Sequence, residues 1–229
     1  MNPPLVVDID GTLTRANVTT SPAPIDPRIF DSLASWRSPV IVATGKAFPF
    51  AVALSEFIGL ERLVIAENGG IACVGNNLSQ LGKESAAKAV ETAMASRGFY
   101  PSDDELGFIN RWRETEVAFR RDVPLETLES LARTHDLHVV DTGYAFHVKD
   151  PEVTKGRALE WVIEQQKYEL DDIVAIGDSV NDVSLFERVG RSYAVSNADD
   201  AAKNTADVVT DKGYADGFLE ALSDLRESR

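Results

Sequence analysis

Short apolar runs alternate with amphipathic segments along most of the 229-residue chain. Each run is continuously apolar, which is typical of the inner strands of a parallel sheet, because helices cover both of their faces. The runs that predict strands of one sheet are residues 5–10, 40–43, 63–66, 71–74, 173–176, 193–195 and 208–209. The alternation predicts an α/β fold with a Rossmann-like parallel-sheet core and helices on both faces.

Capping signals mark several of the helices between these strands. Asp26 followed by Pro27 predicts a helix start, with the aspartate as N-cap and the proline in the first turn, where its missing N–H costs little. Ile29 and Leu33 continue that helix at helical spacing, and Gly59 closes the next one. Later helices are predicted over residues 155–166, 183–189, 201–206 and 218–225.

The pattern of predicted helices and strands in the middle of the chain indicates a separate α+β unit. Asn76 and Asn77 indicate a loop, and residues 111–121 alternate in character like a half-exposed strand. An alanine-rich helix is expected over residues 86–95, and Gly143 joins two predicted strands that end at Asp141 and Lys149. The expected segments are a first part of the core over 1–76, an inserted α+β cap over 77–150 and a second part of the core over 151–229.

The composition bounds the partners and the compartment. The net charge of −14 argues against nucleic acid as a partner, because the phosphate backbone demands a basic surface. No apolar stretch is long enough to span a membrane, and the start of the chain does not resemble a signal peptide. The single cysteine, Cys73, cannot form an internal disulfide, so we expect a cytoplasmic protein. The acidic excess suits either a high-salt cytoplasm or an ordinary acidic protein.

Two aspartates follow the first predicted strand. Asp8 and Asp10 are two residues apart, so their side chains are expected on the same side of an extended chain. Two like charges that close are unfavourable unless a cation lies between them or one carboxyl keeps its proton. The pair therefore predicts a metal site or acid–base chemistry.

Further polar residues follow other strands of the predicted sheet. Thr44-Gly45 comes after the second strand, Asp178 and Asp182 follow the strand over 173–176, and Lys155 opens the helix after the insert. Ligand sites of open α/β sheets lie beyond the carboxyl ends of the strands, so these groups are expected to converge. The oxygen-rich set favours a hard cation, Mg²⁺ above all.

Each of these residues also has an ordinary structural interpretation. Thr44-Gly45 can cradle a phosphate at a helix start, or act as a simple N-cap. Lys155 can bind a phosphoryl oxygen, or lie solvated on the surface. Asp178 and Asp182 can be turn and cap residues. Their joint occurrence, each after a strand and in this order, favours the functional interpretation.

Four motifs resemble those of the haloacid dehalogenase superfamily. They are Asp8-x-Asp10-Gly11-Thr12, Thr44-Gly45, Lys155 and Gly177-Asp178-x-x-Asn181-Asp182. The placement of the insert, together with Glu67-Asn68-Gly69-Gly70, is similar to the Cof-type branch of its phosphatases. The short insert and the approach Phe146-His147-Val148 to the third motif most resemble the archaeal phosphoglycolate phosphatases.

The resemblance implies a role for each motif residue. Asp8 would be the nucleophile that forms an aspartyl-phosphate, and Asp10 the acid and base. Mg²⁺ would be held by Asp8, the backbone carbonyl of Asp10 and Asp178, with Asp182 completing or orienting the metal shell. The substrate-binding residues would be Thr44, Gly45, Lys155 and Asn181, of which Thr44 and Lys155 offset phosphoryl charge.

The implied function is a Mg²⁺-dependent phosphomonoester hydrolase acting on a small phosphorylated metabolite, most of all 2-phosphoglycolate. A sugar-phosphate phosphatase or phosphomutase of the same superfamily, and a non-catalytic metal- or phosphate-binding protein, remain as alternatives. Arg111, Arg113 and Arg121 are all odd-numbered positions of the predicted strand, so their side chains are expected on one face. One of them could meet a substrate carboxylate, or all could be surface charges. Lys46 could serve the phosphate or the surface. The sequence leaves monomer and homodimer open.

Overall fold

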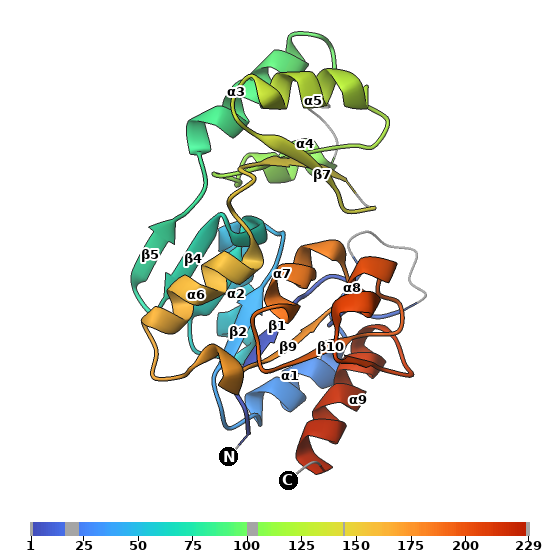
Figure 1. The fold of residues 1–229 in the computed structure, drawn as a ribbon. Coiled ribbons are helices and arrows are strands. Elements are labelled where there is room, and N and C mark those ends of the chain that lie inside the picture. The colour runs from blue at the N-terminus through green and yellow to red at the C-terminus, as the bar shows by residue number, and fades with distance from the viewer. Residues whose placement is uncertain (1, 17–22, 100–104, 144, 228–229) are drawn as a thin grey trace.

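The computed structural model describes residues 2–16, 23–99, 105–143 and 145–227. Figure 1 shows an α/β core that carries both termini at one end and a smaller cap beyond the other end. The chain leaves the core after β5 (Asn77–Gln80) and returns to it through β8 (Phe146–Lys149) and α6 (Lys155–Glu164). Within the described residues, no helix has the length and apolar character that a membrane span requires.

The core sheet has eight strands in the order β11-β10-β9-β1-β2-β3-β4-β5. Neighbours from β11 to β3 are parallel, whereas β4 and β5 run antiparallel at one edge. Its other strands are β1 (Leu5–Val7), β2 (Val40–Ala43), β3 (Leu63–Ala66), β4 (Ile71–Val74), β9 (Val174–Gly177), β10 (Arg191–Ala194) and β11 (Val208–Val209). The predicted α/β fold with a mostly parallel main sheet is confirmed.

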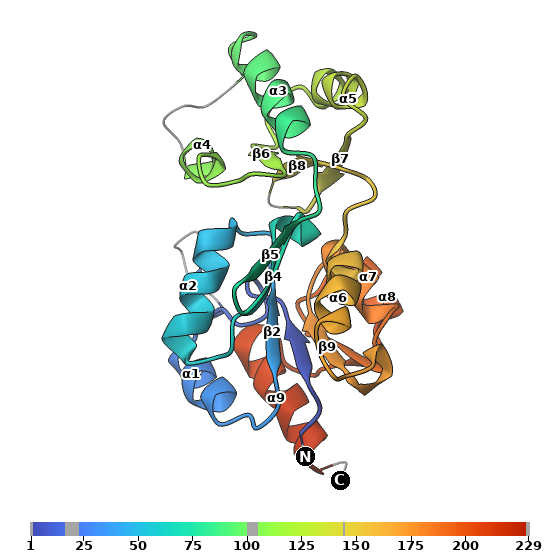
Figure 2. The ribbon, with the colours of Figure 1, turned by 90° about the vertical axis from the view of Figure 1, so that its left-hand side faces the viewer.

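Helices cover both faces of this sheet, as Figure 2 shows nearly edge-on. Alternate side chains of β1 divide between the two layers: Leu5 packs with Ile29 and Phe218, while Val6 packs with Leu159 and Phe186. The first layer holds α1 (Pro27–Ala34), α2 (Phe48–Ile58) and α9 (Tyr214–Glu227), and the second holds α6, α7 (Val183–Phe186) and α8 (Asp200–Thr205). Burial on both faces explains why the inner strands are continuously apolar.

Two predicted helix boundaries are confirmed with their chemistry. The Asp26 side chain accepts a hydrogen bond from the Arg28 N–H at the start of α1, and Pro27 is the first helical residue. Gly59 ends α2 with a φ of 82°, a left-handed conformation that glycine adopts without strain.

The cap is a three-stranded antiparallel sheet under helices. Its strands are β6 (Val117–Phe119), β7 (His138–Asp141) and β8, in the order β6-β8-β7, and its helices are α3 (Glu84–Ala95), α4 (Glu105–Asn110) and α5 (Leu125–Arg133). Phe119 and Val148 pack against Val90 and Leu128 of α3 and α5. In Figure 2, α3 and α5 lie on the side of the sheet away from the core, so the opposite sheet face meets the core.

The structure differs from the sequence prediction in the insert. The strand predicted over 111–121 is wrong over most of its length: Arg111 lies in a turn after α4 and only Val117–Phe119 is a strand. Arg111, Arg113 and Arg121 therefore do not share one face of a strand. The loop predicted at Asn77 is wrong as well, because Asn77 begins β5, which pairs with β4. We propose that the cap begins after β5 rather than at residue 77.

Candidate active site

The polar residues predicted at strand ends meet at the carboxyl ends of the inner strands of the core sheet, which we call the carboxyl edge. Asp8 follows β1 and donates its N–H to the Ile176 carbonyl at 3.0 Å, and Thr44 follows β2 and donates to Ile65 at 2.8 Å. Asp178 follows β9. These residues lie at the carboxyl ends of neighbouring parallel strands, where α/β sheets place their ligands, and Figure 1 shows the cap beyond this edge.

Lys155 brings the carboxylates of this edge together. It is the first residue of α6, whose N-cap Thr154 accepts a hydrogen bond from the Arg157 N–H. Its buried Nζ donates to Asp8 Oδ1 and to Asp182 Oδ1, each at 2.6 Å. Burial works to lower the pKa of Lys155, but the charges of Asp182 and Asp8 outweigh it and hold that pKa above its usual value. Lys155 is therefore a buried, paired cation.

Three carboxylates form a cluster beside this lysine. Carboxylate oxygens of Asp8, Asp178 and Asp182 lie within 4.8 Å of one another. Burial, opposed by Lys155 and reinforced by Asp182 and Asp10, raises the pKa of Asp8 to about 7. Burial also raises the pKa of Asp178 well above its usual value, and Asp8 and Asp182 add to this. Crowded carboxylates of this kind, with oxygen donors only, fit a hard divalent cation.

The loop after β1 holds Asp178 in place. Gly11 has a φ of 82°, and a Cβ at this position would collide with the Asp178 carboxylate, so a larger residue cannot be accommodated. The Thr12 hydroxyl donates to Asp178 Oδ1 at 3.1 Å, and the Asn197 amide donates to the Gly11 carbonyl at 3.0 Å. Glycine and threonine in the first motif thus position a carboxylate of the fourth.

Asp182 is the most enclosed member of the cluster. Its Oδ1 accepts from Lys155, while its Oδ2 accepts from the backbone N–H groups of Asp178 at 3.0 Å and Ser179 at 3.1 Å. Both oxygens are therefore engaged within the protein. This arrangement orients Lys155 and the loop that carries Asp178.

Asp10 lies apart from this cluster. The expectation of one shared side assumed that the strand continues to residue 10, but β1 ends at Val7 and the chain turns at Asp10. The Asp10 side chain is 46% exposed, and its Oδ1 lies 3.0 Å from Lys46 Nζ. Lys46 is therefore the ion-pair partner of Asp10. The two carboxylates occupy different surroundings, one buried and paired with Lys155, the other open to solvent.

The predicted substrate-binding residues surround Asn68. Thr44 is buried, and its hydroxyl accepts from the Lys46 N–H at 3.1 Å. A Cβ on Gly45 would lie 3.0 Å from Asn68 Oδ1, so this glycine lets the two backbones approach closely. Asn181 donates to Asn68 Oδ1 at 2.8 Å and accepts from Lys155 Nζ at 3.4 Å.

Asn68 and its neighbour Glu67 were not predicted as site residues. Both are buried with positive φ values of 53° and 51°, a conformation that costs energy outside glycine and persists only where contacts enforce it. The Glu67 carboxylate accepts from the N–H groups of Glu114 and Thr115 and from the Thr115 hydroxyl. Two polar residues directly after β3, at the same sheet edge as Asp8, were the available sequence signal.

A buried ionic group joins the cap to this edge. Glu116 accepts from Asn68 Nδ2 at 2.9 Å, from Arg113 Nη1 and from the His147 ring at 3.1 Å. Burial would raise the pKa of Glu116, but His147 and Arg113 outweigh it and hold that pKa well below its usual value. Arg113 also donates to the Gly45 carbonyl at 2.7 Å, so it is not the surface charge that its sequence context allowed.

Comparison with known protein families supports this geometry. A model of haloacid dehalogenase-like hydrolases matches residues 5–96 and 124–222. The phosphoglycolate phosphatase of Halobacterium salinarum strain R1 is 50% identical over 225 residues, which cover 98% of each chain. The phosphoglycolate phosphatase of Methanothermobacter thermautotrophicus is 37% identical over 218 residues, covering 95% of this chain and 96% of its own.

Solved structures share the fold of both parts. The crystal structure of protein 0175 from Thermoplasma acidophilum superposes with a TM-score of 0.84, at 25% identity and 99% coverage of each chain. The crystal structure of protein TM0651 from Thermotoga maritima gives a TM-score of 0.73 at 19% identity, covering 99% of this chain and 97% of its own. Core and cap are thus shared over the full length.

Proposed function

Because this chain belongs to the haloacid dehalogenase-like hydrolases, we propose that it is a Mg²⁺-dependent phosphatase that hydrolyses 2-phosphoglycolate to glycolate and phosphate. The substrate is supported by relatives named phosphoglycolate phosphatase, which match nearly the whole chain at identities from 50% to 37%. The observation that carries the reaction type is the buried contact of Lys155 Nζ with Asp8 Oδ1 at 2.6 Å, beside the aspartate cluster.

Asp8 is the proposed nucleophile. One of its carboxylate oxygens attacks phosphorus, the bond from phosphorus to the glycolate oxygen breaks, and an aspartyl-phosphate forms. Lys155 holds the attacking carboxylate and offsets charge on the phosphoryl group as it is transferred. Thr44 and the Gly45 N–H contribute donors from the loop after β2.

Asp10 is the proposed acid and base. It donates a proton to the departing glycolate oxygen in the first step. In the second step it takes a proton from water, whose oxygen attacks phosphorus, and the bond to Asp8 breaks to release phosphate. Its exposed position beside Lys46 suits this exchange, because the same carboxyl must reach both the leaving group and water.

Asp8, Asp178 and the backbone carbonyl of Asp10 would hold the cation, and Asp182 would orient Lys155 and the loop that carries Asp178. Mg²⁺ is favoured because it binds to few carboxylates and keeps positions for substrate phosphate oxygens. Bound there, it would offset the charge of the phosphate and of the carboxylate nucleophile. A non-catalytic phosphate-binding protein would not need Asp8, Asp10 and Lys155 together.

A screen of small phosphate esters tests the proposal. The purified protein in Mg²⁺ is given 2-phosphoglycolate, sugar phosphates and nucleotides, and kcat/KM is compared. We expect the largest value for 2-phosphoglycolate. A clear preference for a sugar phosphate would overturn the substrate, and transfer of phosphate to a second hydroxyl of a sugar would indicate a phosphomutase. Absence of turnover with every ester would favour a binding protein.

A further inference from the structure

The cap-sheet face that meets the core carries two buried polar side chains on its central strand, β8, opposite the apolar Ala118 and Val140. Side chains alternate along a strand, so His147 and Lys149 share this face of β8, whereas Phe146 and Val148 point to the cap helices. Figure 2 shows the sheet between those helices and the core. The alternation thus places the buried Lys149 on the side of the cap sheet that faces the carboxyl ends of the core strands.

Lys149 has few partners for a buried cation. It is 7% exposed, and its Nζ donates to the Asn68 carbonyl at 3.1 Å. Across the part of the chain that the structure describes, no carboxylate forms an ion pair with it. An ammonium has three donors, so two of them have no protein acceptor among those residues. Buried charges are normally paired, so this position favours an anionic ligand.

The surrounding charges lead to the same conclusion. Burial lowers the pKa of Lys149 to about 8; the charges of Glu116 and Asp150 oppose this shift, and the nearby Lys155 adds to it. The Glu116 carboxylate is already occupied by Arg113, His147 and Asn68. Two buried lysines thus repel each other, and an anion bound near both would offset this repulsion.

Asn68 lies between Lys149 and the loop after β2 that carries Thr44 and Gly45, called the phosphoryl loop below. Its N–H donates to the Thr44 carbonyl at 3.1 Å, its side chain packs on Gly45, and its own carbonyl accepts from Lys149. Only one residue therefore separates the phosphoryl loop from the ammonium. A two-carbon leaving group bonded to phosphorus is comparably short, so its carboxylate could reach this ammonium.

We propose that Lys149 binds the carboxylate of the leaving group and thereby selects phosphorylated hydroxy acids over phosphate esters whose leaving group carries no charge. The inference rests on the proposed function, because it assumes hydrolysis at the edge formed by Asp8 and Lys155. It adds the group that recognises the substrate class. A charged hydrogen bond to a carboxylate supplies the discrimination that an apolar pocket cannot.

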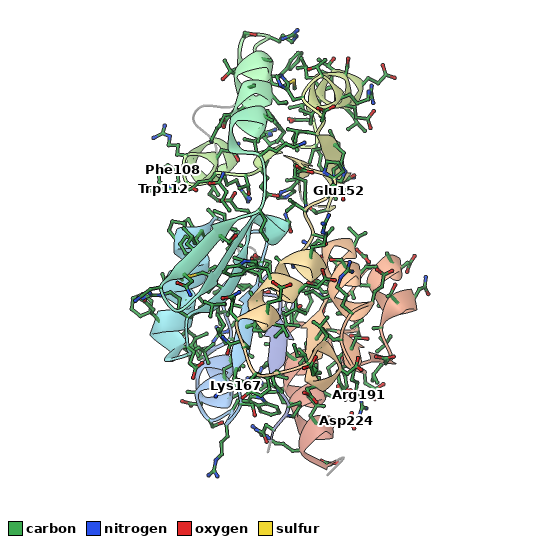
Figure 3. The ribbon with its side chains drawn as sticks, turned by 60° about the vertical axis from the view of Figure 1, so that its left-hand side comes forward. Phe108, Trp112, Glu152, Lys167, Arg191 and Asp224 are labelled. Carbon is green, nitrogen blue, oxygen red and sulfur yellow. The ribbon has the colours of Figure 1, made fainter. Side chains whose placement is uncertain are left out.

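The test compares 2-phosphoglycolate with ethyl phosphate, in which a methyl group replaces the carboxylate. The readout is the ratio of the two kcat/KM values, measured for the wild type, Lys149→Met and a matched control, Lys167→Met. Lys167 is exposed and lies at the end of the core far from the cap (Figure 3). We expect the ratio to fall by at least about 10-fold in Lys149→Met and to stay at the wild-type value in Lys167→Met.

A second variant protects the test against loss of folding. Lys149→Gln removes the charge but keeps an N–H donor for the Asn68 carbonyl, and its ratio should fall in the same way. Lys149→Arg keeps the cation and should retain most of the preference. Equal losses on both esters in Lys149→Gln, or an unchanged ratio in either neutral variant, would overturn the proposal, because a structural role lowers both rates together.

The outcomes separate this inference from the proposed function. If the wild type prefers 2-phosphoglycolate and the ratio survives in Lys149→Gln, the inference fails and the function stands. If another phosphorylated hydroxy acid, such as phospholactate, is preferred and that preference is lost in Lys149→Gln, the substrate is wrong and the inference stands. A wild type that prefers no carboxylated ester contradicts both.

Discussion

In the core sheet both faces are apolar and the charges gather at the carboxyl ends of the strands, whereas one face of the cap sheet carries buried polar side chains among apolar ones. Val6 and Val7 of β1 point into opposite hydrophobic layers, and the first charge follows at Asp8. In β8, His147 and Lys149 lie on the face opposite Val148 and are nevertheless buried. The core sheet thus provides the reacting groups from its end, and the cap sheet provides polar groups from its surface.

The difference has a physical origin. Parallel strands connected by helices have both faces covered, so polar side chains find partners only where strands end. An antiparallel sheet can leave one face for polar residues. Here Lys149 on that face donates to the Asn68 carbonyl of the core, and Asn68 in turn donates to Glu116 of the cap. Chemistry and selectivity therefore have separate structural sources, and each can be disturbed independently.

The largest expected effect comes from the core edge. Asp8→Asn removes the proposed nucleophile, so kcat/KM with 2-phosphoglycolate should fall by at least about 10⁴-fold, as for other enzymes without their nucleophile. The exposed Asp31→Asn on α1 is the control and should keep wild-type activity. Normal turnover by Asp8→Asn would contradict the covalent mechanism.

Removal of the metal is the second test of that edge. Treatment with a chelator should abolish activity, and Mg²⁺ should restore it, because the crowded carboxylates need a cation to act on a phosphate dianion. Mg²⁺ at about 100 times its dissociation constant should also stabilise the folded protein by about 2.7 kcal/mol in urea unfolding. Asp178→Asn should weaken this stabilisation. An enzyme indifferent to chelation would refute the metal site.

The cap–core contact is tested by stability. Glu116→Gln removes a buried charge that pairs with Arg113 and His147, so the free energy of unfolding should fall by about 3–5 kcal/mol. Glu152→Gln is the matched control, because its 2.7 Å pair with Arg157 is exposed (Figure 3) and should contribute less than about 1 kcal/mol. Equal effects in urea unfolding would remove the distinction between this contact and a surface ion pair.

The smallest effect is a pH dependence carried by Lys149. Its pKa is about 8 in the folded protein and 10.5 ordinarily, so between these values the unfolded chain holds a proton that the folded chain has released. Stability from this group therefore rises with pH across that window, by up to about 3 kcal/mol, and is constant below it. Urea unfolding at pH 7.5 and pH 10 should show this rise in the wild type and in Lys167→Met, but not in Lys149→Met.

The core edge was predictable from sequence because its signals are local. Strand ends, glycines and carboxylates occur within a few residues of one another, and Asp8, Thr44 and Asp178 each follow an apolar run. The structure brings their carboxyl-end positions together, as the α/β pattern predicts. Asp10 was predicted less well. The direction of its side chain depends on the residue at which β1 ends, and the ends of strands are less predictable from sequence than the strands themselves.

The cap was less predictable because its polar residues have partners far along the chain. Arg113 resembles a surface charge until it meets Gly45, and Glu116 resembles an exposed strand residue until Asn68 covers it. The alternation in β8 does indicate two faces, but not that both are buried. Partners 48 to 81 residues apart in sequence leave no local pattern.

The sequence by itself determined the α/β class, the inserted cap and the residues of the four motifs, because periodicity and strand-end chemistry are properties of short segments. Only the tertiary structure decided that Lys155 pairs with Asp8 and Asp182, that Asp10 stands apart with Lys46, and that the cap sheet buries Lys149 against the core. Burial and pairing of charge depend on which segments meet in space, and those meetings determine the electrostatics of this site.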